Sequence, residues 1–302
     1  MLDRRSAAVF ALWSCCAGPV VAFGQGVDPH AAQPERPTVA THAGTVAPGW
    51  IEIETGGEFD RFGDGSHGAG ATIVTKVGLG SHVQLNIYGS AIRLPDRDSL
   101  GIGDSAVGVK WRMTDAAPVL GRFAILPSIK FPSGSLSLGT GTDTTDASLL
   151  LISSHDLGPV ALDLNASYTR RSGDGEIIPR DAALWTASFG GPALGQAGWV
   201  AELYGLPRIS GPLDSTVAVL FGPTLAVRSW LIFDGGVIVP IAGPAPHAVY
   251  FGAVWNIGRA WRSDDRRPRA GAPLRGTDFH EELRRRPSSD RDQPPILPAQ
   301  QH

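Results

Sequence analysis

The chain has 302 residues, including 38 glycines, and its formal net charge is −3 at neutral pH. This length allows one or two domains, and so mild a charge does not favour a nucleic acid or any other charged partner. Lysine occurs only at Lys76, Lys110 and Lys130, and no long stretch has helical periodicity. Many short alternating runs with glycine-rich turns instead predict an all-β sandwich or barrel.

Residues 1–22 have the pattern of a secretory signal peptide. Two arginines precede an apolar run over residues 6–21, and the small residues at its end predict cleavage after Ala22. The alternatives are a buried first helix and a lipoprotein signal in which Cys15 is lipidated. Cys15 and Cys16 are the two cysteines of the chain, so cleavage after Ala22 leaves no disulfide and no cysteine-based metal site.

Residues 23–48 follow as a segment that is rich in proline, alanine, threonine and histidine. The segment has no apolar periodicity, so its pattern predicts neither a helix nor a strand. We interpret it as an N-terminal linker that faces the periplasm, or alternatively as a loosely held plug.

Alternation of apolar and polar residues begins near Trp50 and recurs as far as Gly258. Successive side chains of a strand point to opposite faces, so such runs predict β-strands. An even number of strands is expected when a single-chain barrel begins and ends on the same side of a membrane. Within residues 49–258 we expect twelve strands, over residues 50–62, 71–79, 83–88, 106–113, 122–131, 147–157, 160–169, 183–194, 199–204, 215–225, 230–240 and 247–258.

The hairpin within residues 101–134 illustrates the two faces that these strands would have. One face carries aliphatic and aromatic side chains, and the other carries small residues and cations. A strand with this pattern separates an apolar environment from water. We expect Trp111, Met113 and Phe123 to face lipid, and Lys110, Arg112 and Lys130 to face a polar lumen.

The connections between the expected strands alternate in length. Long polar loops such as residues 132–146 follow the first, third, fifth and seventh strands, whereas Gly80-Ser81 and Gly158-Pro159 follow the second and sixth. This sorting is typical of outer-membrane barrels, and nothing in a soluble sandwich requires it. Because lipid leaves no partner for an open sheet edge, the sequence predicts an antiparallel transmembrane β-barrel in the outer membrane of a Gram-negative bacterium.

Two features fit this barrel less well. Pro127, Pro223 and Pro240 lie within or at the ends of expected strands, where a missing N–H interrupts the ladder. We therefore expect bulges or shorter strands at these positions. Residues 259–302 are rich in arginine, aspartate and proline, which predicts a disordered tail with at most a brief helix over residues 278–286.

Patterns for catalysis and for metal binding are weak. The chain has no G-x-S-x-G motif, and we expect no serine and acid to accompany His82, His155 or His247. The acidic turns at residues 60–65 and 143–146 are more typical of ordinary loops than of a cation site. We therefore predict that the protein is not an enzyme, that it uses no cofactor or metal, and that it binds no nucleic acid.

Several short motifs occur in the same order as in a known family. They are GDSAVGVKWR (103–112), PSIKFPSG (127–134), GTGTD (139–143), LNASY (164–168) and AELYG (201–205). With these motifs the chain resembles the meta-pathway phenol-degradation transporters, a family of outer-membrane β-barrels. The resemblance implies an outer-membrane protein linked to the uptake of aromatic compounds.

We predict a channel or transporter for the passive uptake of small molecules, aromatic ones among them, with access set by loop 132–146. The alternatives are a structural barrel with a closed lumen and an outer-membrane enzyme that modifies lipid. The expected partners are outer-membrane lipid and a small-molecule solute. The candidate lumen residues for tuning selectivity are Lys110, Arg112, Lys130, Asp163 and Glu202. For each of these residues the alternative role is a salt bridge that fills the lumen.

Overall fold

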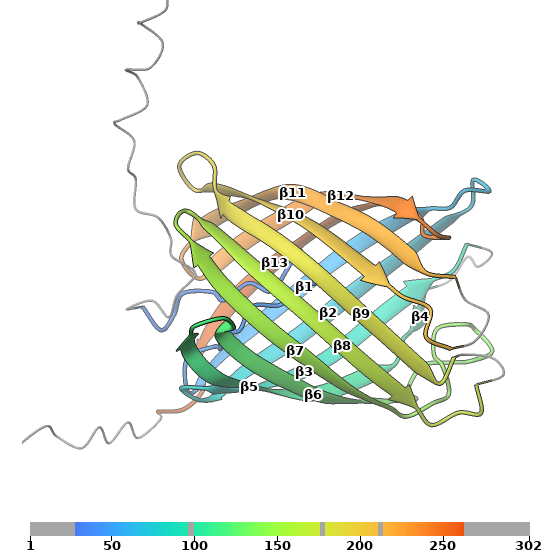
Figure 1. Cartoon of the computed structure of the whole chain (residues 1–302), viewed down its shortest axis with the longest axis horizontal. Helices are drawn as coiled ribbons and strands as arrows, with labels where there is room; N and C mark the ends of the chain where they lie inside the picture. Colours follow the sequence, from blue (N-terminus) through green and yellow to red (C-terminus); the bar gives the residue numbers. More distant parts are fainter. Residues whose placement is uncertain (1–27, 96–99, 176–178, 211–213, 263–302) are drawn as a thin grey trace, which may run out of the picture. The chain divides into compact units, whose positions relative to one another are not determined.

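The computed structural model describes residues 28–95, 100–175, 179–210 and 214–262, most of which form a β-barrel (Figure 1). The expected signal peptide with Cys15, and the expected tail beyond residue 262 with its brief helix, lie outside the described residues. Within the described ranges no helix is long and apolar enough to cross a membrane, an observation that concerns helices alone.

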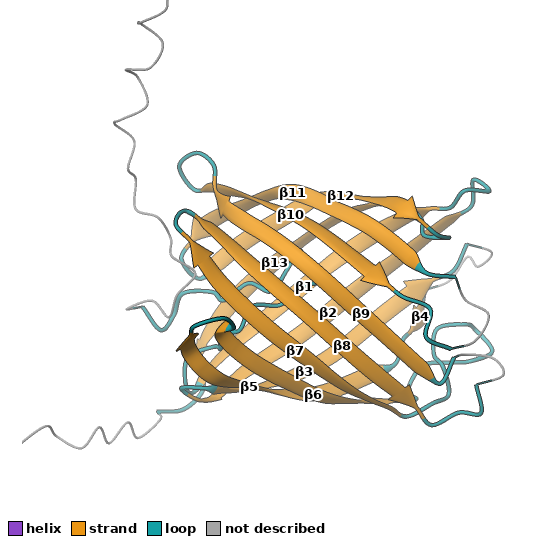
Figure 2. Ribbon diagram, in the orientation of Figure 1, coloured by secondary structure: helices purple, strands orange, loops and turns teal. Residues whose placement is uncertain are grey.

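The described strands form one antiparallel sheet that closes on itself (Figure 2). Closure follows from the pairing of β1 with both β2 and β13, while β2 also pairs with β3. Twelve long strands make the wall, and the two-residue β4 lies beside β3. The strands are β1 (Trp50–Arg61), β2 (His67–Gly80), β3 (Val83–Arg93), β4 (Gly101–Ile102), β5 (Ser105–Ala117), β6 (Gly121–Phe131), β7 (Asp146–Leu157), β8 (Val160–Arg171), β9 (Asp181–Pro192), β10 (Ala197–Leu206), β11 (Thr216–Arg228), β12 (Leu231–Ala242) and β13 (His247–Arg259). The predicted all-β, antiparallel barrel of twelve strands is confirmed.

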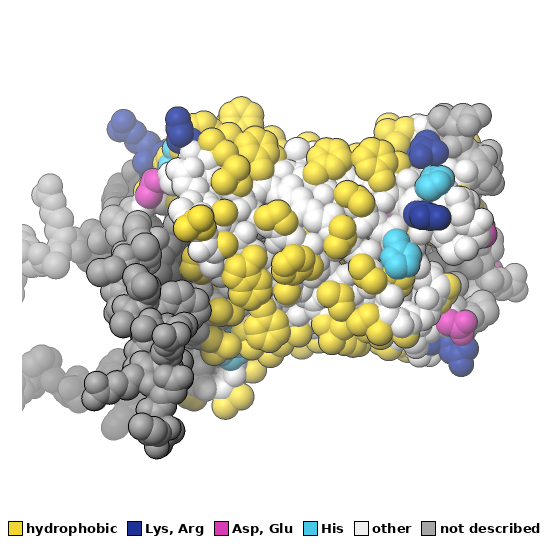
Figure 3. Space-filling view, turned by 90° about the horizontal axis from the view of Figure 1, so that it is seen from above, with side chains coloured by type: hydrophobic (Ala, Val, Ile, Leu, Met, Phe, Trp, Pro, Cys, Tyr) yellow, Lys and Arg dark blue, Asp and Glu magenta, His cyan; other side chains and the backbone are white. Residues whose placement is uncertain are grey.

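The two faces of the wall differ in the way that the alternation predicts. On β5, the side chain of Trp111 is 50% exposed, whereas the neighbouring Lys110 is 0% exposed. Met113 shares the exposed face with Trp111, and Phe123 lies half-buried on the same face of β6. Figure 3 shows hydrophobic side chains over the middle of the barrel and charged side chains gathered at its ends. Exposed apolar surface gathered in this way marks a site of interaction with a membrane or another protein.

The two ends of the barrel differ in their connections. Tight turns at residues 81–82, 158–159 and 229–230 lie at one end, and loops such as residues 132–145 lie at the other. Trp50, at the start of β1, pairs with Arg259, at the end of β13. The chain therefore enters and leaves the barrel at the tight-turn end.

The three prolines do not shorten the strands, so that part of the expectation was wrong. The strands continue past Pro127 and Pro223 because each stays paired with the neighbour on its other side, β7 and β10 respectively. At Pro127 the pairing of β6 with β5 is interrupted, and at Pro223 the pairing of β11 with β12 is interrupted. At Pro240 the register between β11 and β12 shifts by one residue, as a bulge requires.

Candidate functional site: a lumen filled by the N-terminal segment

Residues 28–49 lie inside the barrel near its tight-turn end, and we call them the lumen segment (Figure 1). Near its beginning, the Ala32 N–H donates to the Ser229 carbonyl at 2.7 Å, and at its end the Gly49 N–H donates to the Gly78 carbonyl at 2.7 Å. Ser229 lies in a tight turn, and Gly78 lies three residues before the tight turn at residues 81–82. The segment, which the sequence left open as a linker or a loosely held plug, therefore enters and leaves the lumen at the same end.

The lumen segment has no regular secondary structure of its own. Pro34, Pro37 and Pro48 lack a backbone N–H, so the segment cannot continue a helical or strand ladder through them. Its N–H and C=O groups are nevertheless buried in the lumen, and buried backbone groups need hydrogen-bond partners. Between its two ends, most of those partners are side chains on the inner face of the wall.

Two glutamates of β1 bind the first part of the segment. The Gln33 N–H donates to Glu52 Oε2 at 2.6 Å, and the Glu35 N–H donates to Glu54 Oε1 at 2.7 Å. From the first pair to the second, the residue number rises by two both in the segment and in β1. The segment therefore runs extended beside β1, in register with its inward-facing side chains.

Glu202 of β10 and Asn165 of β8 bind the middle of the segment. The two carboxylate oxygens of Glu202 accept hydrogen bonds from the Val39 N–H at 2.7 Å and the Ala40 N–H at 2.6 Å. The Asn165 amide accepts from the Thr41 N–H at 2.7 Å and donates to the Thr41 carbonyl at 2.9 Å. One wall side chain thus serves both backbone groups of one segment residue.

The last part of the segment is bound by β7 and β3. The Ala43 N–H donates to Ser154 Oγ at 2.8 Å, and the Val46 N–H donates to Gln84 Oε1 at 2.7 Å. Ala43 also packs in a small apolar cluster on the inner wall, which consists of Ala124, Leu126 and Ile152. Contacts with β1, β10, β8, β7 and β3 carry the segment around most of the inner circumference.

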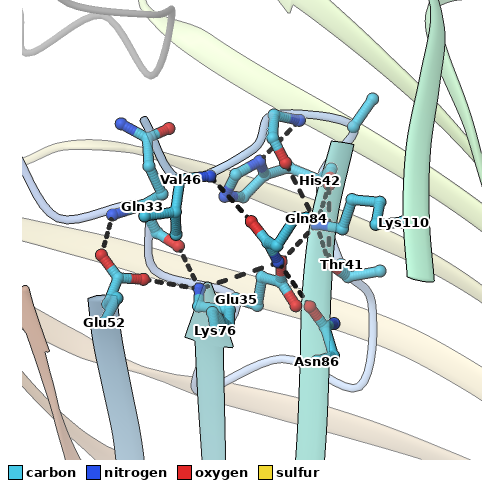
Figure 4. Close-up of polar contacts among 12 residues, drawn as sticks. Gln33, Glu35, Thr41, His42, Val46, Glu52, Lys76, Gln84, Asn86 and Lys110 are labelled. Atoms are coloured by element: carbon cyan, nitrogen blue, oxygen red, sulfur yellow. Dashed lines mark hydrogen bonds and ion pairs between the residues drawn. The ribbon is translucent and has the colours of Figure 1, made fainter. Parts of the chain in front are cut away.

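Five charged side chains form the centre of the site, and Figure 4 labels four of them: Glu35, Glu52, Lys76 and Lys110. The ammonium of Lys76 lies 2.6 Å from Glu52, 2.7 Å from Glu54 and 3.8 Å from Glu35. Lys110 forms an ion pair with Glu35 on its other side. Both lysine side chains are fully buried, so the carboxylates must compensate for the lost hydration of the ammonium groups. Glu35, which belongs to the segment, joins the two lysines of the wall.

The electrostatic setting fixes the charge state of two segment residues. Burial by itself would raise the pKa of Glu35, but Lys110 and Lys76 outweigh it and hold the pKa well below its usual range. Burial, together with the nearby Lys110, lowers the pKa of His42 to about 3. Glu35 is therefore charged and His42 is neutral at physiological pH, and His42 Nδ1 accepts a hydrogen bond from the Gly44 N–H at 2.9 Å.

Arg36 binds a different part of the wall from its neighbour Glu35. Its guanidinium forms an ion pair with Asp234 of β12 at 3.2 Å and donates to the Phe251 carbonyl of β13 at 3.2 Å. A Cβ atom on either Gly56 or Gly252 would overlap this guanidinium. These two glycines pair across β1 and β13, so the bare backbone of the wall makes the space for Arg36.

No family model matches the chain, and no curated protein sequence matches it. Among solved structures, the barrel is similar to an outer-membrane channel from Pseudomonas putida F1, with a TM-score of 0.53, 11% identity, and coverage of 70% of this chain and 97% of that chain. It is also similar to the KdgM porin, with a TM-score of 0.47, 12% identity, and coverage of 68% and 98%. The chain has the fold of an outer-membrane barrel. At these identities the likeness concerns the fold alone.

Of the five residues predicted to line the lumen, Lys110 and Glu202 contact the lumen segment directly, and Asp163 binds a wall residue that contacts it. Lys110 donates to the His42 carbonyl at 2.9 Å and to the Gly44 carbonyl at 3.1 Å, besides its ion pair with Glu35. Glu202 holds two segment N–H groups, and Asp163 accepts a hydrogen bond from Ser154 Oγ at 2.5 Å. Their part in selectivity remains a prediction.

The other two predicted residues lie apart from this group. Arg112 is buried near the tight turns, where it pairs with Asp115 at 3.0 Å and donates to the Ser81 carbonyl at 2.8 Å. Lys130 lies towards the opposite end, where it pairs with Asp104 at 2.6 Å and donates to the Thr144 carbonyl at 2.9 Å. Each therefore supports a connection between strands.

Asp104 anchors the loop over residues 132–145 by hydrogen bonds. Its carboxylate accepts hydrogen bonds from the Gly134 N–H at 2.9 Å and the Thr142 N–H at 3.0 Å. Burial would raise the pKa of Asp104, but Lys130 and these N–H groups outweigh it and lower the pKa to about 2. The loop is thus tied to the barrel by a charged carboxylate.

The expectation that His82 lacks a neighbouring serine and acid was wrong. Ser81 Oγ lies 2.9 Å from His82 Nδ1, and Asp115 lies 3.3 Å from His82 Nε2. His82 and Asp115 are exposed at the tight-turn end, and Asp115 also pairs with Arg112. The polar groups that gather in the lumen lie elsewhere, around the segment.

Sequence reasoning missed the residues that join the segment to the wall. Glu35 and Arg36 occur in a stretch without periodicity, and pattern gives no indication of their partners. An acid and a base between two prolines, in a segment with few other charges, is the signal that could have marked them. Asn165 and Gln84 are ordinary inward-facing amides of their strands, and only contact with the segment distinguishes them.

Proposed function

We propose that the protein spans the outer membrane as a channel for the passive movement of small solutes along its polar lumen. The observation that carries this proposal is a closed barrel with an apolar outside and a charged, amide-rich inside. Lys76, Lys110, Glu202 and Asn165 line the lumen with polar groups. Water and polar solutes could cross the membrane along such a lumen, whereas they cannot cross the hydrocarbon of the bilayer. A preference for aromatic solutes is supported by the motif resemblance alone.

In this proposal the lumen segment controls the tight-turn end of the channel. Residues 28–49 contact strands around most of the inner wall. Solute passage therefore requires that the segment moves or gives up some of these contacts. Displacement would expose Lys110, Glu202 and Asp163 to the solute, and these are the residues that we propose to tune selectivity. The segment itself contributes Glu35 and Arg36 to the same path.

The second candidate function is a structural barrel with a closed lumen. The number of hydrogen bonds that hold the segment favours it, because a segment bound by buried charges costs several kcal/mol to release. The two candidates differ in whether the segment leaves its place often enough for ions to pass.

Conductance across planar lipid bilayers tests the channel. We expect the wild-type protein to conduct weakly and the variant E35Q/R36A to conduct more strongly, because it loses the ionic contacts of the segment with Lys76, Lys110 and Asp234. The matched control is R170A/D181N, which removes one cation and one anion from an exposed ion pair of β8 and β9. Bilayers that stay sealed with both the wild type and E35Q/R36A, with a barrel that still migrates differently when unboiled, would refute the channel. Acyl transfer or lipid hydrolysis by the same samples would favour the enzyme alternative.

A further inference from the structure

We propose that the inner wall around the lumen segment is a binding site for extended polypeptide backbone, and that a peptide from another molecule can take the place of the segment. This inference names a ligand class for the proposed lumen, and it rests on the proposed channel for a route by which the peptide arrives.

The wall recognises the N–H groups of the segment more than its side chains. Each accepting atom is a carboxylate, amide or hydroxyl oxygen on an inward-facing position of a strand, at 2.6–2.8 Å from the donor nitrogen. The donors are the N–H groups of Gln33, Glu35, Val39, Ala40, Thr41, Ala43 and Val46. An array of acceptors in this arrangement matches the repeated donors of a polypeptide.

The wall also recognises carbonyl groups. Lys76 donates to the Gln33 carbonyl at 2.6 Å, and Lys110 donates to the His42 carbonyl at 2.9 Å. The two-sided contact of Asn165 with Thr41 uses an N–H and a C=O of the same residue. An aromatic solute does not present this repeating pair of groups, whereas every peptide does.

The space beside the backbone limits the side chains that the site accepts. Ala40, Ala43 and Val46 are almost fully buried, so larger side chains at these positions would overpack the lumen. Ionic recognition is confined to Glu35 and Arg36, which bind Lys110 and Asp234. The ligand class is therefore an extended peptide of small residues, with an adjacent acid and base as additional contacts.

A competing peptide must overcome the advantage of a tethered segment. The segment is joined directly to β1, which gives it an effective concentration in the millimolar range. Removing the ionic contacts of Glu35 and Arg36 reduces this advantage and leaves the residues of the wall unchanged. The full-length variant E35Q/R36A is therefore the appropriate protein for a binding assay.

The assay measures the fluorescence anisotropy of a labelled peptide with the sequence of residues 30–46, added to folded E35Q/R36A in detergent. We expect saturable binding, together with faster amide exchange at residues 33–46 of the chain as the segment is displaced. N-methylation of the peptide at the position of Ala40 removes a bond to Glu202 and should weaken binding about tenfold or more. The matched control carries N-methyl at the position of Gly44, whose N–H binds His42 within the segment, and should bind within threefold of the parent peptide.

Several results would overturn the inference. They are the absence of saturable binding up to several millimolar peptide, binding without faster exchange of the segment, and equal affinity of the two N-methylated peptides. A peptide that keeps Ala40, Ala43, Gly44 and Val46 and has the other residues of 38–46 shuffled should bind within threefold. A much larger loss would show recognition of a specific sequence instead. The assay needs no conductance, so a barrel that conducts without binding peptide overturns only this inference. A sealed barrel that binds peptide overturns only the proposed channel.

Discussion

Replacing Lys110 with methionine removes one charge from the centre of the site and keeps most of the volume of the side chain. The lysine is fully buried, and its ammonium contacts the Glu35 carboxylate, the His42 carbonyl and the Gly44 carbonyl. The methionine can make none of these contacts. We expect the barrel to fold, because the wall is held by its backbone ladder, and we expect the lumen segment to become loosely bound.

The free energy cost of Lys110→Met depends on the partners that the Glu35 carboxylate still has in the variant. Removing one partner of a buried ion pair costs about 3–5 kcal/mol. Glu35 still lies 3.8 Å from Lys76 and accepts a hydrogen bond from Gln84 Nε2 at 3.2 Å, so the lower end of that range applies. A cost of about 3 kcal/mol corresponds to a change of about a hundredfold in the equilibrium between bound and released segment, since 1.4 kcal/mol is tenfold.

Hydrogen exchange at the amides of residues 39–46 measures this equilibrium, because their N–H groups are protected only while the wall holds them. Lys130→Met is the matched control, since Lys130 is a lumen lysine that contacts Asp104 and not the segment. Adding Glu35→Gln to Lys110→Met removes the unpaired carboxylate and should recover at least tenfold of the lost protection. Exchange of K110M within threefold of the wild type would refute the reasoning, as would an equal effect of K130M.

Two further predictions concern the outside of the barrel and its long loop. Trp111→Arg places a charge on the apolar face. Trp111 pairs with Val83, directly after the tight turn at residues 81–82, so the variant should lower the free energy of unfolding in lipid vesicles by about 1 kcal/mol, less than at the bilayer midplane. Trp111→Leu should remain near the wild type, and equal stabilities of the two variants would contradict a lipid-facing Trp111. The pKa of Asp104 is lowered from 3.8 to about 2, so its contribution to the loop is complete above pH 3.8 and is lost as the pH falls through about 2. A spin label at residue 136 should therefore gain mobility at low pH, and Asp104→Asn should show that mobility already at neutral pH.

Much of the wall could be predicted because its signal is local. Lys110 and Trp111 are adjacent in sequence and lie on opposite faces of β5, which follows from the period of two in any strand. The alternation of tight turns with longer loops likewise indicated which end of the barrel each strand meets. The strands drawn through the three prolines were not too long, because each strand has two neighbours and a single pairing is sufficient to continue it.

The position of the lumen segment was decided by the tertiary structure alone. Its partners are distant in sequence: Ala40 binds Glu202, and Glu35 lies between Lys76 and Lys110. A segment without periodicity gives no local indication of such contacts, since most of its hydrogen bonds go to wall side chains and not to the backbone of a neighbouring strand. The sequence by itself determined a closed barrel with a polar inside and an apolar outside, because alternation is a property of neighbouring residues. Closure then created the confined, charged interior in which the backbone of residues 28–49 finds its partners.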